Sequence, residues 1–222
     1  ASAGGTLAAA EHAQRHGFAG VLAGGTHHAY VDFGSGYCVF NDLAIAARRI
    51  LSRRWARRVL VVDLDVHQGD GTAAIFKDDP RVFTLSLHGA RNFPARKQES
   101  DLDVALPDDT GDTAYGLALG DALDAAVAAS RPEFLLYQAG VDALAEDRLG
   151  RLALTLDGLR ERDERVFDLA RALGVPIVTT LGGGYADPLE PTLAAHEQTY
   201  RVAVKRFGTD SALDPTPRTA GP

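Results

Sequence analysis

The sequence predicts an α/β fold of three layers, in which helices cover both faces of a parallel central sheet. Segments with the apolar period of helices alternate along the chain with short runs rich in β-branched residues, the pattern of strand–helix–strand units. The run RVLVVDLD, at 58–65, has the apolar character of a strand buried on both faces. Right-handed crossovers then bring the carboxyl ends of the strands to one edge, where such folds bind ligands.

The elements of the first half follow from local patterns. The first predicted helix, 5–16, is rich in alanine and stops before Gly17, a residue favoured just after a helix. A short apolar segment that ends in glycines, 18–25, is predicted to be a strand. Residues 39–54 form the next predicted helix, because their apolar side chains recur on one side. The buried strand described above is followed by a short predicted helix at 71–78.

The second half continues the alternation around one long connection. A strand is predicted at 82–88, followed by a polar loop at 89–111 that contains several Pro and Gly residues. A loop of this length within a compact domain is usually functional. The helix at 112–129 is expected to begin with Asp112 as its N-cap. The remaining elements are predicted at 133–140 (strand), 156–173 (helix), 175–184 (strand) and 189–207 (helix).

Length and composition limit the class of protein. The 222 residues fit one domain, predicted at 1–207, followed by a Pro-, Thr- and Gly-rich tail at 208–222 that we expect to be disordered. A net charge of -7 and a pI near 5.4 argue against nucleic acid as a ligand. The single cysteine, Cys38, allows no intrachain disulfide, and no membrane-spanning run or signal peptide is visible. We therefore expect a cytoplasmic protein without a membrane partner.

Ionisable side chains follow nearly every predicted strand. His27 and His28 come after the first strand, DLDVHQGDG after the second and His88 after the third, while Asp142 and Tyr185 follow the last two. Because parallel strands end at the same edge of the sheet, these groups are expected to converge. This convergence indicates a functional site.

The stretch VVDLDVHQGDG has the pattern of a metal site. Residues two apart in an extended chain point the same way, so Asp63, Asp65 and His67 share one face. Two carboxylates and an imidazole suit a divalent cation such as Zn²⁺ or Fe²⁺. A catalytic metal needs about three protein ligands, and Asp142 from another strand end is the candidate third. The alternative is a polar loop that merely follows a strand.

The two adjacent histidines and the tyrosine suggest acid–base chemistry. His27 and His28 can each bond a different carboxylate, with Asp63 and Asp70 as candidates, and a histidine so oriented beside a metal is a general base. Tyr185 follows three glycines and can donate a hydrogen bond to an oxyanion. The alternatives are a structural histidine pair and a packed tyrosine. A phosphate-binding loop is disfavoured, because no GxGxxG or Walker lysine is present.

Taken together, the motifs resemble those of the histone deacetylase superfamily. The segments that carry the resemblance are GGTHHAY, SGYCVFND, DLDVHQGDGT, FTLSLHG, QAGVD, EDRLG and LGGGY. They span roughly residues 4–207 and most resemble bacterial proteins near the class IV type. The resemblance implies the arginase/deacetylase fold. Because the chain begins at the Ala-rich helix and contains no Met, we expect the first strand region of that fold to be missing.

The resemblance also implies roles for individual residues. The metal ligands would be Asp65, His67 and Asp142, which usually bind Zn²⁺ and in some cases Fe²⁺ in this family. His28 matches the general base and acid, His27 its electrostatic partner, and Tyr185 the group that polarises the scissile carbonyl. Asp63 and Asp70 match the carboxylates behind the histidines. A structural K⁺ or Na⁺ would be held by Asp63, Asp65, His67, Ser86 and Leu87. The walls of the acyl-lysine channel match Gly36, Tyr37, Phe93 and Leu149.

The implied activity is zinc-dependent hydrolysis of an acylated amine, most simply acyl-lysine in a protein or peptide. The apolar Leu149 at the channel rim argues against a polyamine, whose cationic chain would favour a carboxylate there. An acetylpolyamine or other small-amide deacetylase is the alternative enzyme. The alternative from another class is a non-catalytic protein or fragment that keeps the fold. A ureohydrolase would need a two-metal carboxylate set, which the sequence does not offer.

Overall fold

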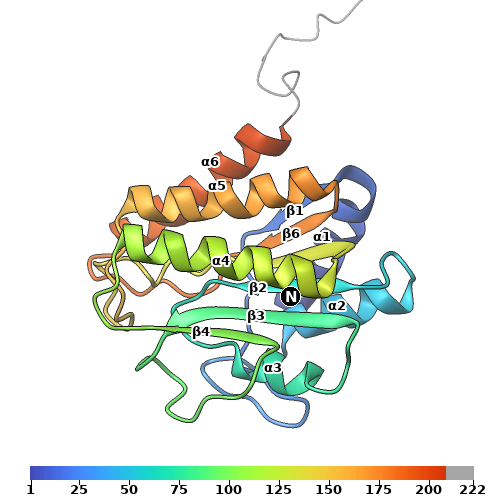
Figure 1. The fold of residues 1–222 in the computed structure, drawn as a ribbon, viewed down its shortest axis with the longest axis horizontal. Helices are drawn as coiled ribbons and strands as arrows, with labels where there is room; N and C mark the ends of the chain where they lie inside the picture. Colours follow the sequence, from blue (N-terminus) through green and yellow to red (C-terminus); the bar gives the residue numbers. More distant parts are fainter. Residues whose placement is uncertain (209–222) are drawn as a thin grey trace, which may run out of the picture.

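A computed structural model of the chain describes residues 1–208, which form three layers around one sheet (Figure 1). The strands are β1 Phe18–Val21, β2 Val59–Asp63, β3 Val82–Gly89, β4 Leu102–Leu106, β5 Phe134–Gln138 and β6 Ile177–Thr180. All of them pair in parallel, in the order β1-β6-β5-β2-β3-β4. The helices are α1 Ser2–His16, α2 Asp42–Ser52, α3 Asp70–Phe76, α4 Asp112–Ser130, α5 Leu156–Leu173 and α6 Glu190–Phe207. The predicted fold class is confirmed.

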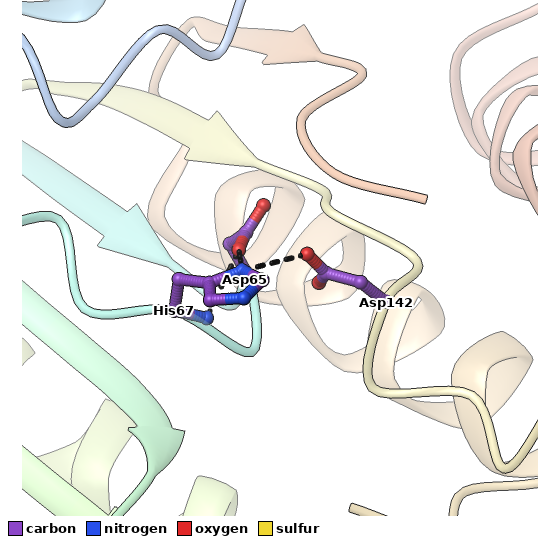
Figure 2. Close-up of side chains that lie close together, drawn as sticks. All are labelled: Asp65, His67 and Asp142. Atoms are coloured by element: carbon purple, nitrogen blue, oxygen red, sulfur yellow. Dashed lines mark hydrogen bonds and ion pairs between the residues drawn. The ribbon is translucent and has the colours of Figure 1, made fainter. Parts of the chain in front are cut away.

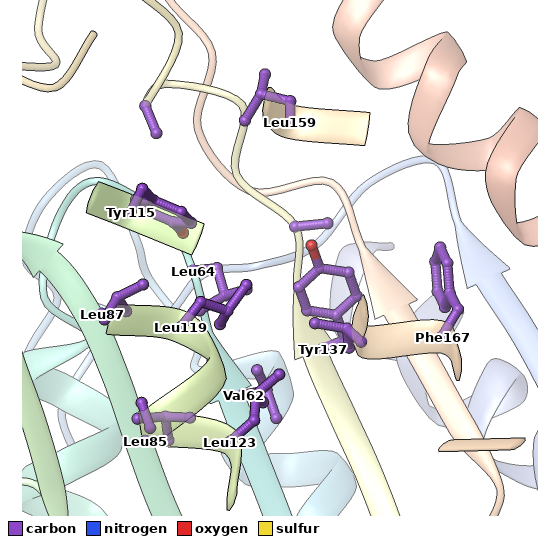
Figure 3. Close-up of a cluster of buried hydrophobic side chains, with 14 of the residues drawn as sticks. Val62, Leu64, Leu85, Leu87, Tyr115, Leu119, Leu123, Tyr137, Leu159 and Phe167 are labelled. Atoms are coloured by element: carbon purple, nitrogen blue, oxygen red, sulfur yellow. The ribbon is translucent and has the colours of Figure 1, made fainter. Parts of the chain in front are cut away.

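The period-two alternation of the central strand builds a core on each face of the sheet. In β2, Leu60 and Val62 pack toward α4, α5 and α6, whereas Val59 and Val61 pack toward α1, α2 and α3. Figure 3 shows the first of these cores, with side chains of α4 and α5 lying over the central strands. Strand β2 is buried along its whole length, which explains its unbroken apolar run.

The start of one helix and the N-cap of another differ from the prediction. Helix α2 begins at Asp42 because the side chain of Asn41 accepts a hydrogen bond of 2.9 Å from the backbone N–H of Ala44. The prediction of Asp112 as an N-cap was wrong, since Gly111 occupies that position. The Asp112 carboxylate instead accepts hydrogen bonds from the N–H and hydroxyl of Thr155, at 2.9 and 2.7 Å.

The long loop predicted at 89–111 contains a strand. Strand β4 pairs with β3 from Leu85↔Leu102 to Gly89↔Leu106 and forms one edge of the sheet. Its five residues alternate in exposure: Leu102, Val104 and Leu106 pack toward the core, whereas Asp103 and Ala105 are exposed. Short edge strands carry only a weak hydrophobic signal, which explains why the sequence pattern missed it.

Other element bounds differ by a few residues, mostly because the predicted strands at 18–25, 133–140 and 175–184 end earlier in the structure. The predicted tail at 208–222 lies outside the described residues, apart from Gly208. Among the described helices, none combines the length and the apolar character that a bilayer crossing requires.

Candidate active site

The site lies where the sheet order changes direction. From β2 the chain runs outward to β3 and β4, then returns to the other side of β2 to form β5. Ligands of parallel α/β sheets bind at such switch points, beyond the carboxyl ends of the two strands. Asp65 and His67 follow β2 here, and Asp142 follows β5. The switch point therefore brings together side chains that are 75 residues apart in sequence.

Asp65, His67 and Asp142 form a compact buried cluster (Figure 2). The Nδ1 atom of His67 lies 3.0 Å from Asp65 Oδ1 and 3.0 Å from Asp142 Oδ2. One ligand atom from each residue lies within 4.8 Å of the other two. Strand β2 ends at Asp63, but Leu64 and Val66 still pack into the core, so Asp65 and His67 share the opposite face as the alternation predicts.

Backbone N–H groups hold the two carboxylates in place. The N–H of Gly183 donates to Asp65 Oδ2, and the N–H of Val66 donates to Asp142 Oδ1, both at 2.8 Å. Each carboxylate thus presents one oxygen to the His67 ring while the other accepts a backbone N–H, and Asp65 Oδ1 also accepts the N–H of His67 at 3.0 Å. A side chain at Gly183 would collide with this arrangement, because a Cβ atom there would lie 2.0 Å from Asp142 Oδ2.

The electrostatics of the cluster fit a bound cation. Burial, and then the charge of Asp65, raise the pKa of Asp142 to about 7. Burial disfavours a charge on His67, yet its hydrogen bonds to Asp142 and Asp65 raise its pKa to about 10. A proton on His67 thus offsets the two converging carboxylates in the metal-free protein. Two carboxylate oxygens and one imidazole nitrogen in the same buried position suit a divalent cation such as Zn²⁺ or Fe²⁺.

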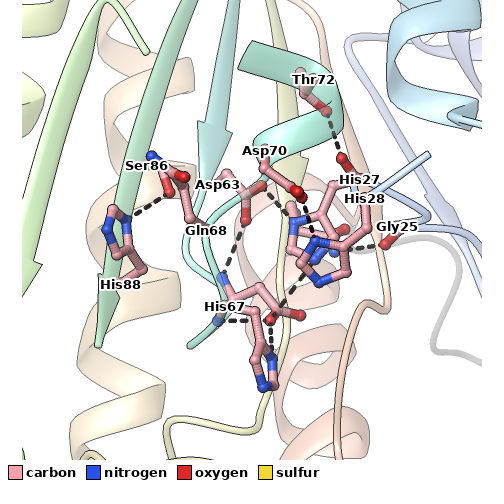
Figure 4. A network of polar contacts seen from close by, with 12 residues as sticks. Gly25, His27, His28, Asp63, His67, Gln68, Asp70, Thr72, Ser86 and His88 are labelled. Atoms are coloured by element: carbon pink, nitrogen blue, oxygen red, sulfur yellow. Dashed lines mark hydrogen bonds and ion pairs between the residues drawn. The ribbon is translucent and has the colours of Figure 1, made fainter. Parts of the chain in front are cut away.

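Each of the two adjacent histidines is bonded to its own carboxylate (Figure 4). The Nδ1 atom of His27 lies 2.6 Å from Asp63 Oδ2, and the Nδ1 atom of His28 lies 2.6 Å from Asp70 Oδ1. Asp70 also accepts a hydrogen bond of 2.9 Å from the hydroxyl of Tyr30. These contacts fix both imidazole rings and leave their Nε2 atoms for other partners.

The two histidines have opposite protonation preferences. Burial opposes charge on His27, but the nearby carboxylates Asp63 and Asp65 outweigh it and raise its pKa to about 9. Burial, reinforced by the positive charge of His27, lowers the pKa of His28. At neutral pH His27 is therefore a cation, while His28 is a neutral imidazole that can accept a proton.

A cavity of about 510 Å³ opens beside this cluster and contains His28 and His67 in its lining. All four residues predicted for the substrate channel also line it, namely Gly36, Tyr37, Phe93 and Leu149. Tyr185 lines the cavity as well, and its ring centroid lies 6.4 Å from that of His67. The ring of Phe93 stands edge-on to His28, with 4.9 Å between the centroids. The structure thus brings the predicted channel and catalytic residues to one place.

Three residues of the cavity were not found from the sequence: Arg91, Asn92 and Arg151. Asn92 joins the two rim loops, because its Nδ2 atom donates to Leu149 O at 2.8 Å and its Oδ1 atom accepts from Arg151 N at 3.2 Å. For Arg91 and Asn92 the only signal was the length of the predicted loop 89–111, which suggested function without indicating individual residues, and Arg151 gave no signal.

Of the residues predicted for a monovalent cation, Asp65 and His67 belong to the cluster, Asp63 ends β2, and Ser86 and Leu87 lie on the neighbouring strand β3. Ser86 is paired in register with Asp63, and its hydroxyl lies 2.9 Å from His88 Nδ1. The side chain of Leu87 is buried in the core, which leaves only its main chain available to an ion. The K⁺ or Na⁺ site stays a prediction.

Comparison with known proteins identifies the family. The model of the histone deacetylase domain matches residues 1–200. The chain belongs to the histone deacetylase family. Histone deacetylase 2 of Arabidopsis thaliana is 36% identical over 185 residues, which cover 82% of this chain and 48% of that protein. An uncharacterized protein of Picosynechococcus is 48% identical over 200 residues, 90% of this chain and 67% of that protein.

A solved structure supports the same assignment. The acetylpolyamine aminohydrolase of Burkholderia pseudomallei superposes with a TM-score of 0.76 at 29% identity, over 94% of this chain and 61% of that one. The chain thus spans about half to two thirds of the length of these relatives. The predicted resemblance to this superfamily is confirmed.

Proposed function

We propose that the protein hydrolyses an acylated amine, with a divalent cation held by Asp65, His67 and Asp142. The observation that carries this proposal is the position of the buried cluster beside the cavity, which both His67 and the neutral His28 line. A divalent cation bound there would supply Lewis-acid activation of water and of the acyl carbonyl. Zn²⁺ suits this donor set best, and Fe²⁺ is the second choice.

In this proposal the protein side chains divide the remaining chemistry. His28 accepts a proton from the attacking water and passes it to the departing amine, because burial and His27 keep it neutral. Asp70 holds the His28 ring in place through Nδ1. The Tyr185 phenol, whose pKa is raised by burial and nearby carboxylates, stays protonated and donates to the oxyanion that forms on the acyl oxygen. Protonated His27 adds positive charge behind the reacting group.

We propose acyl-lysine in a protein or peptide as the substrate. The rim of the cavity contains the apolar Leu149 and two arginines, Arg91 and Arg151, and none of the described residues that line it is a carboxylate. Both arginines pair with Asp108, which does not line the cavity, so the charged side chains that line the rim are guanidinium groups. A cationic polyamine chain would be repelled there, whereas a peptide backbone would not. Acetylpolyamine stays the alternative, because the superposed neighbour is an acetylpolyamine aminohydrolase.

A substrate panel tests this proposal. We expect a fluorogenic acetyl-lysine peptide to be hydrolysed, hydrolysis to require a divalent cation, and a metal-chelating hydroxamate to block it. Long-chain acyl-lysine peptides and acetylpolyamine are the comparison substrates, and His28→Ala is the inactive control. Faster hydrolysis of acetylpolyamine would favour the alternative enzyme. No hydrolysis of any of them by metal-loaded protein would favour a non-catalytic role.

A further inference from the structure

A buried arginine lies beneath the two loops that carry the proposed metal ligands. Arg162, on α5, is 1% exposed, and it is the largest fully buried side chain among the described residues. A buried guanidinium is costly unless charged and polar partners surround it. Its partners therefore indicate what the residue does.

The guanidinium of Arg162 bridges the two ligand loops. Its Nη1 atom donates to the carbonyl of Gly140 at 2.5 Å and to the carbonyl of Leu64 at 3.4 Å. Leu64 directly precedes Asp65, and Gly140 comes two residues before Asp142. One atom thus contacts the backbone of both loops immediately next to their carboxylates.

The same guanidinium is anchored from below. Its Nε and Nη2 atoms lie 2.9 and 2.8 Å from Asp163 Oδ1. Asp163 is held in turn by the hydroxyls of Tyr137, at 2.5 Å, and Thr199, at 2.6 Å. The rigid guanidinium thus transmits the position of α5 to the two loops, which a flexible ammonium could not do with the same geometry.

The loops have little room to adjust without this contact. A Cβ atom at Gly140 would lie 2.3 Å from Asp65 Oδ2, so the backbone of the second loop already touches the carboxylate of the first. A shift of either carbonyl therefore changes the separation of Asp65 and Asp142. Groups behind metal ligands commonly alter metal affinity by about 10- to 100-fold in this way.

We propose that Arg162 is a positioning residue that sets the spacing of Asp65 and Asp142 and thereby the affinity of the cluster for a divalent cation. This inference rests on the proposed function only in assuming that the cluster binds such a cation. The competing explanation is that Arg162 and Asp163 merely stabilise the packing of α5.

Variants of Arg162 and of the other residues bonded to Asp163 separate the two explanations. Arg162→Lys keeps a cation beside Asp163 but replaces the guanidinium, and Arg162→Met removes the charge as well. Thr199→Val and Tyr137→Phe are matched controls, because each removes one hydrogen bond to Asp163 and leaves the Arg162 guanidinium unchanged, and phenylalanine keeps the ring that packs beside it. Zn²⁺ affinity is measured by competition with a chelator, the ligand field by the visible spectrum of the Co²⁺-loaded protein, and folding by urea denaturation.

We expect Arg162→Lys to lower Zn²⁺ affinity by about 10-fold and Arg162→Met by about 100-fold, with a changed Co²⁺ spectrum. The two controls should lower the urea midpoint and leave affinity within about 2-fold. If affinity falls in all four variants in proportion to stability, or stays unchanged in Arg162→Lys, the positioning role is refuted. Should Arg162→Met fail to fold, Arg162→Lys alone decides. A wild-type protein that binds no Zn²⁺ would instead refute the proposed function.

Discussion

A single methyl group at Gly183 should disable the metal cluster without disturbing the fold. The backbone of Gly183 lies outside the positive-φ region, so alanine can adopt its conformation without strain. The added Cβ atom would, however, lie 2.0 Å from Asp142 Oδ2 and 2.9 Å from Asp65 Oδ2. Because ordinary contacts begin near 3.4 Å, Asp142 would have to move away from the position in which it faces His67.

The size of the effect on metal affinity depends on how far the collision moves the Asp142 carboxylate from the position that a bound cation requires. In the metal-free protein the Asp142 carboxylate is buried and held by the N–H of Val66, so Gly183→Ala should lower the free energy of unfolding modestly while the chain still folds. A bound cation requires the carboxylate in its original place, and overpacking of this kind costs about 1–3 kcal/mol. That cost corresponds to a loss of roughly 5- to 150-fold in affinity. Isothermal titration with Zn²⁺ measures the affinity, and urea denaturation of the metal-free protein measures stability.

Gly111→Ala is the matched control, since a Cβ atom there would meet only Ala153 O, at 3.7 Å. It should bind Zn²⁺ like the wild type. If Gly183→Ala also binds Zn²⁺ with unchanged affinity, the cation does not require Asp142 where the structure has it, and the assignment of the cluster is wrong.

Three further predictions concern the base, the rim and stability at low pH. His28→Ala should lower kcat by about 10²- to 10⁴-fold while metal content, measured by atomic absorption, stays at the wild-type level; a smaller loss would mean that another group takes the proton. Arg151→Glu should raise kcat/KM for acetylpolyamine relative to an acetyl-lysine peptide by about 30-fold, because the substitution changes the rim by two unit charges and each contributes about 1 kcal/mol at an exposed site. An unchanged ratio would exclude rim charge as a selector. Burial lowers the pKa of His196 to about 4 in the folded protein, whereas the same side chain has a pKa of about 6.5 in the unfolded chain. As the pH falls, the unfolded chain is therefore protonated at His196 before the folded protein is. The contribution of this residue to stability is present above about pH 6.5 and is lost as the pH falls toward 4. Urea denaturation across this pH range should show that His196→Asn loses less folding stability than the wild type, by up to about 3 kcal/mol. Equal losses of stability would contradict the lowered pKa of His196.

Elements with a strong local signal were predictable. The helix predicted at 156–173 has the bounds of α5, because Thr155 caps its start and Gly174 follows its end with a φ of 65°. Strand β4 was missed because its alternating pattern covers only five residues, of which Val104 alone is β-branched, and pairing with β3 is needed to make it a strand. The role of Asp112 depends on Thr155, 43 residues later, and no local pattern reports such a contact.

The candidate site was predictable to the extent that its residues follow strand ends. The family motifs and the rule for parallel sheets are together sufficient to predict that Asp65, His67 and Asp142 meet at one edge of the sheet. Arg162 and Arg151 gave no such signal. The first is one of several charged residues on an amphipathic helix, and only the packed structure shows that it is buried. Which of many arginines lies behind or beside a site is decided by long-range packing.

The central claim is that the cluster of Asp65, His67 and Asp142 binds one divalent cation that drives hydrolysis of an acylated lysine. The most direct test is to titrate metal-free protein with Zn²⁺ while following hydrolysis of an acetyl-lysine peptide. We predict that the rate rises with added Zn²⁺ and saturates at one ion per chain, and that Asp142→Ala shows no rise. Full activity in chelator-treated protein, or a rise of wild-type size in Asp142→Ala, would contradict the claim.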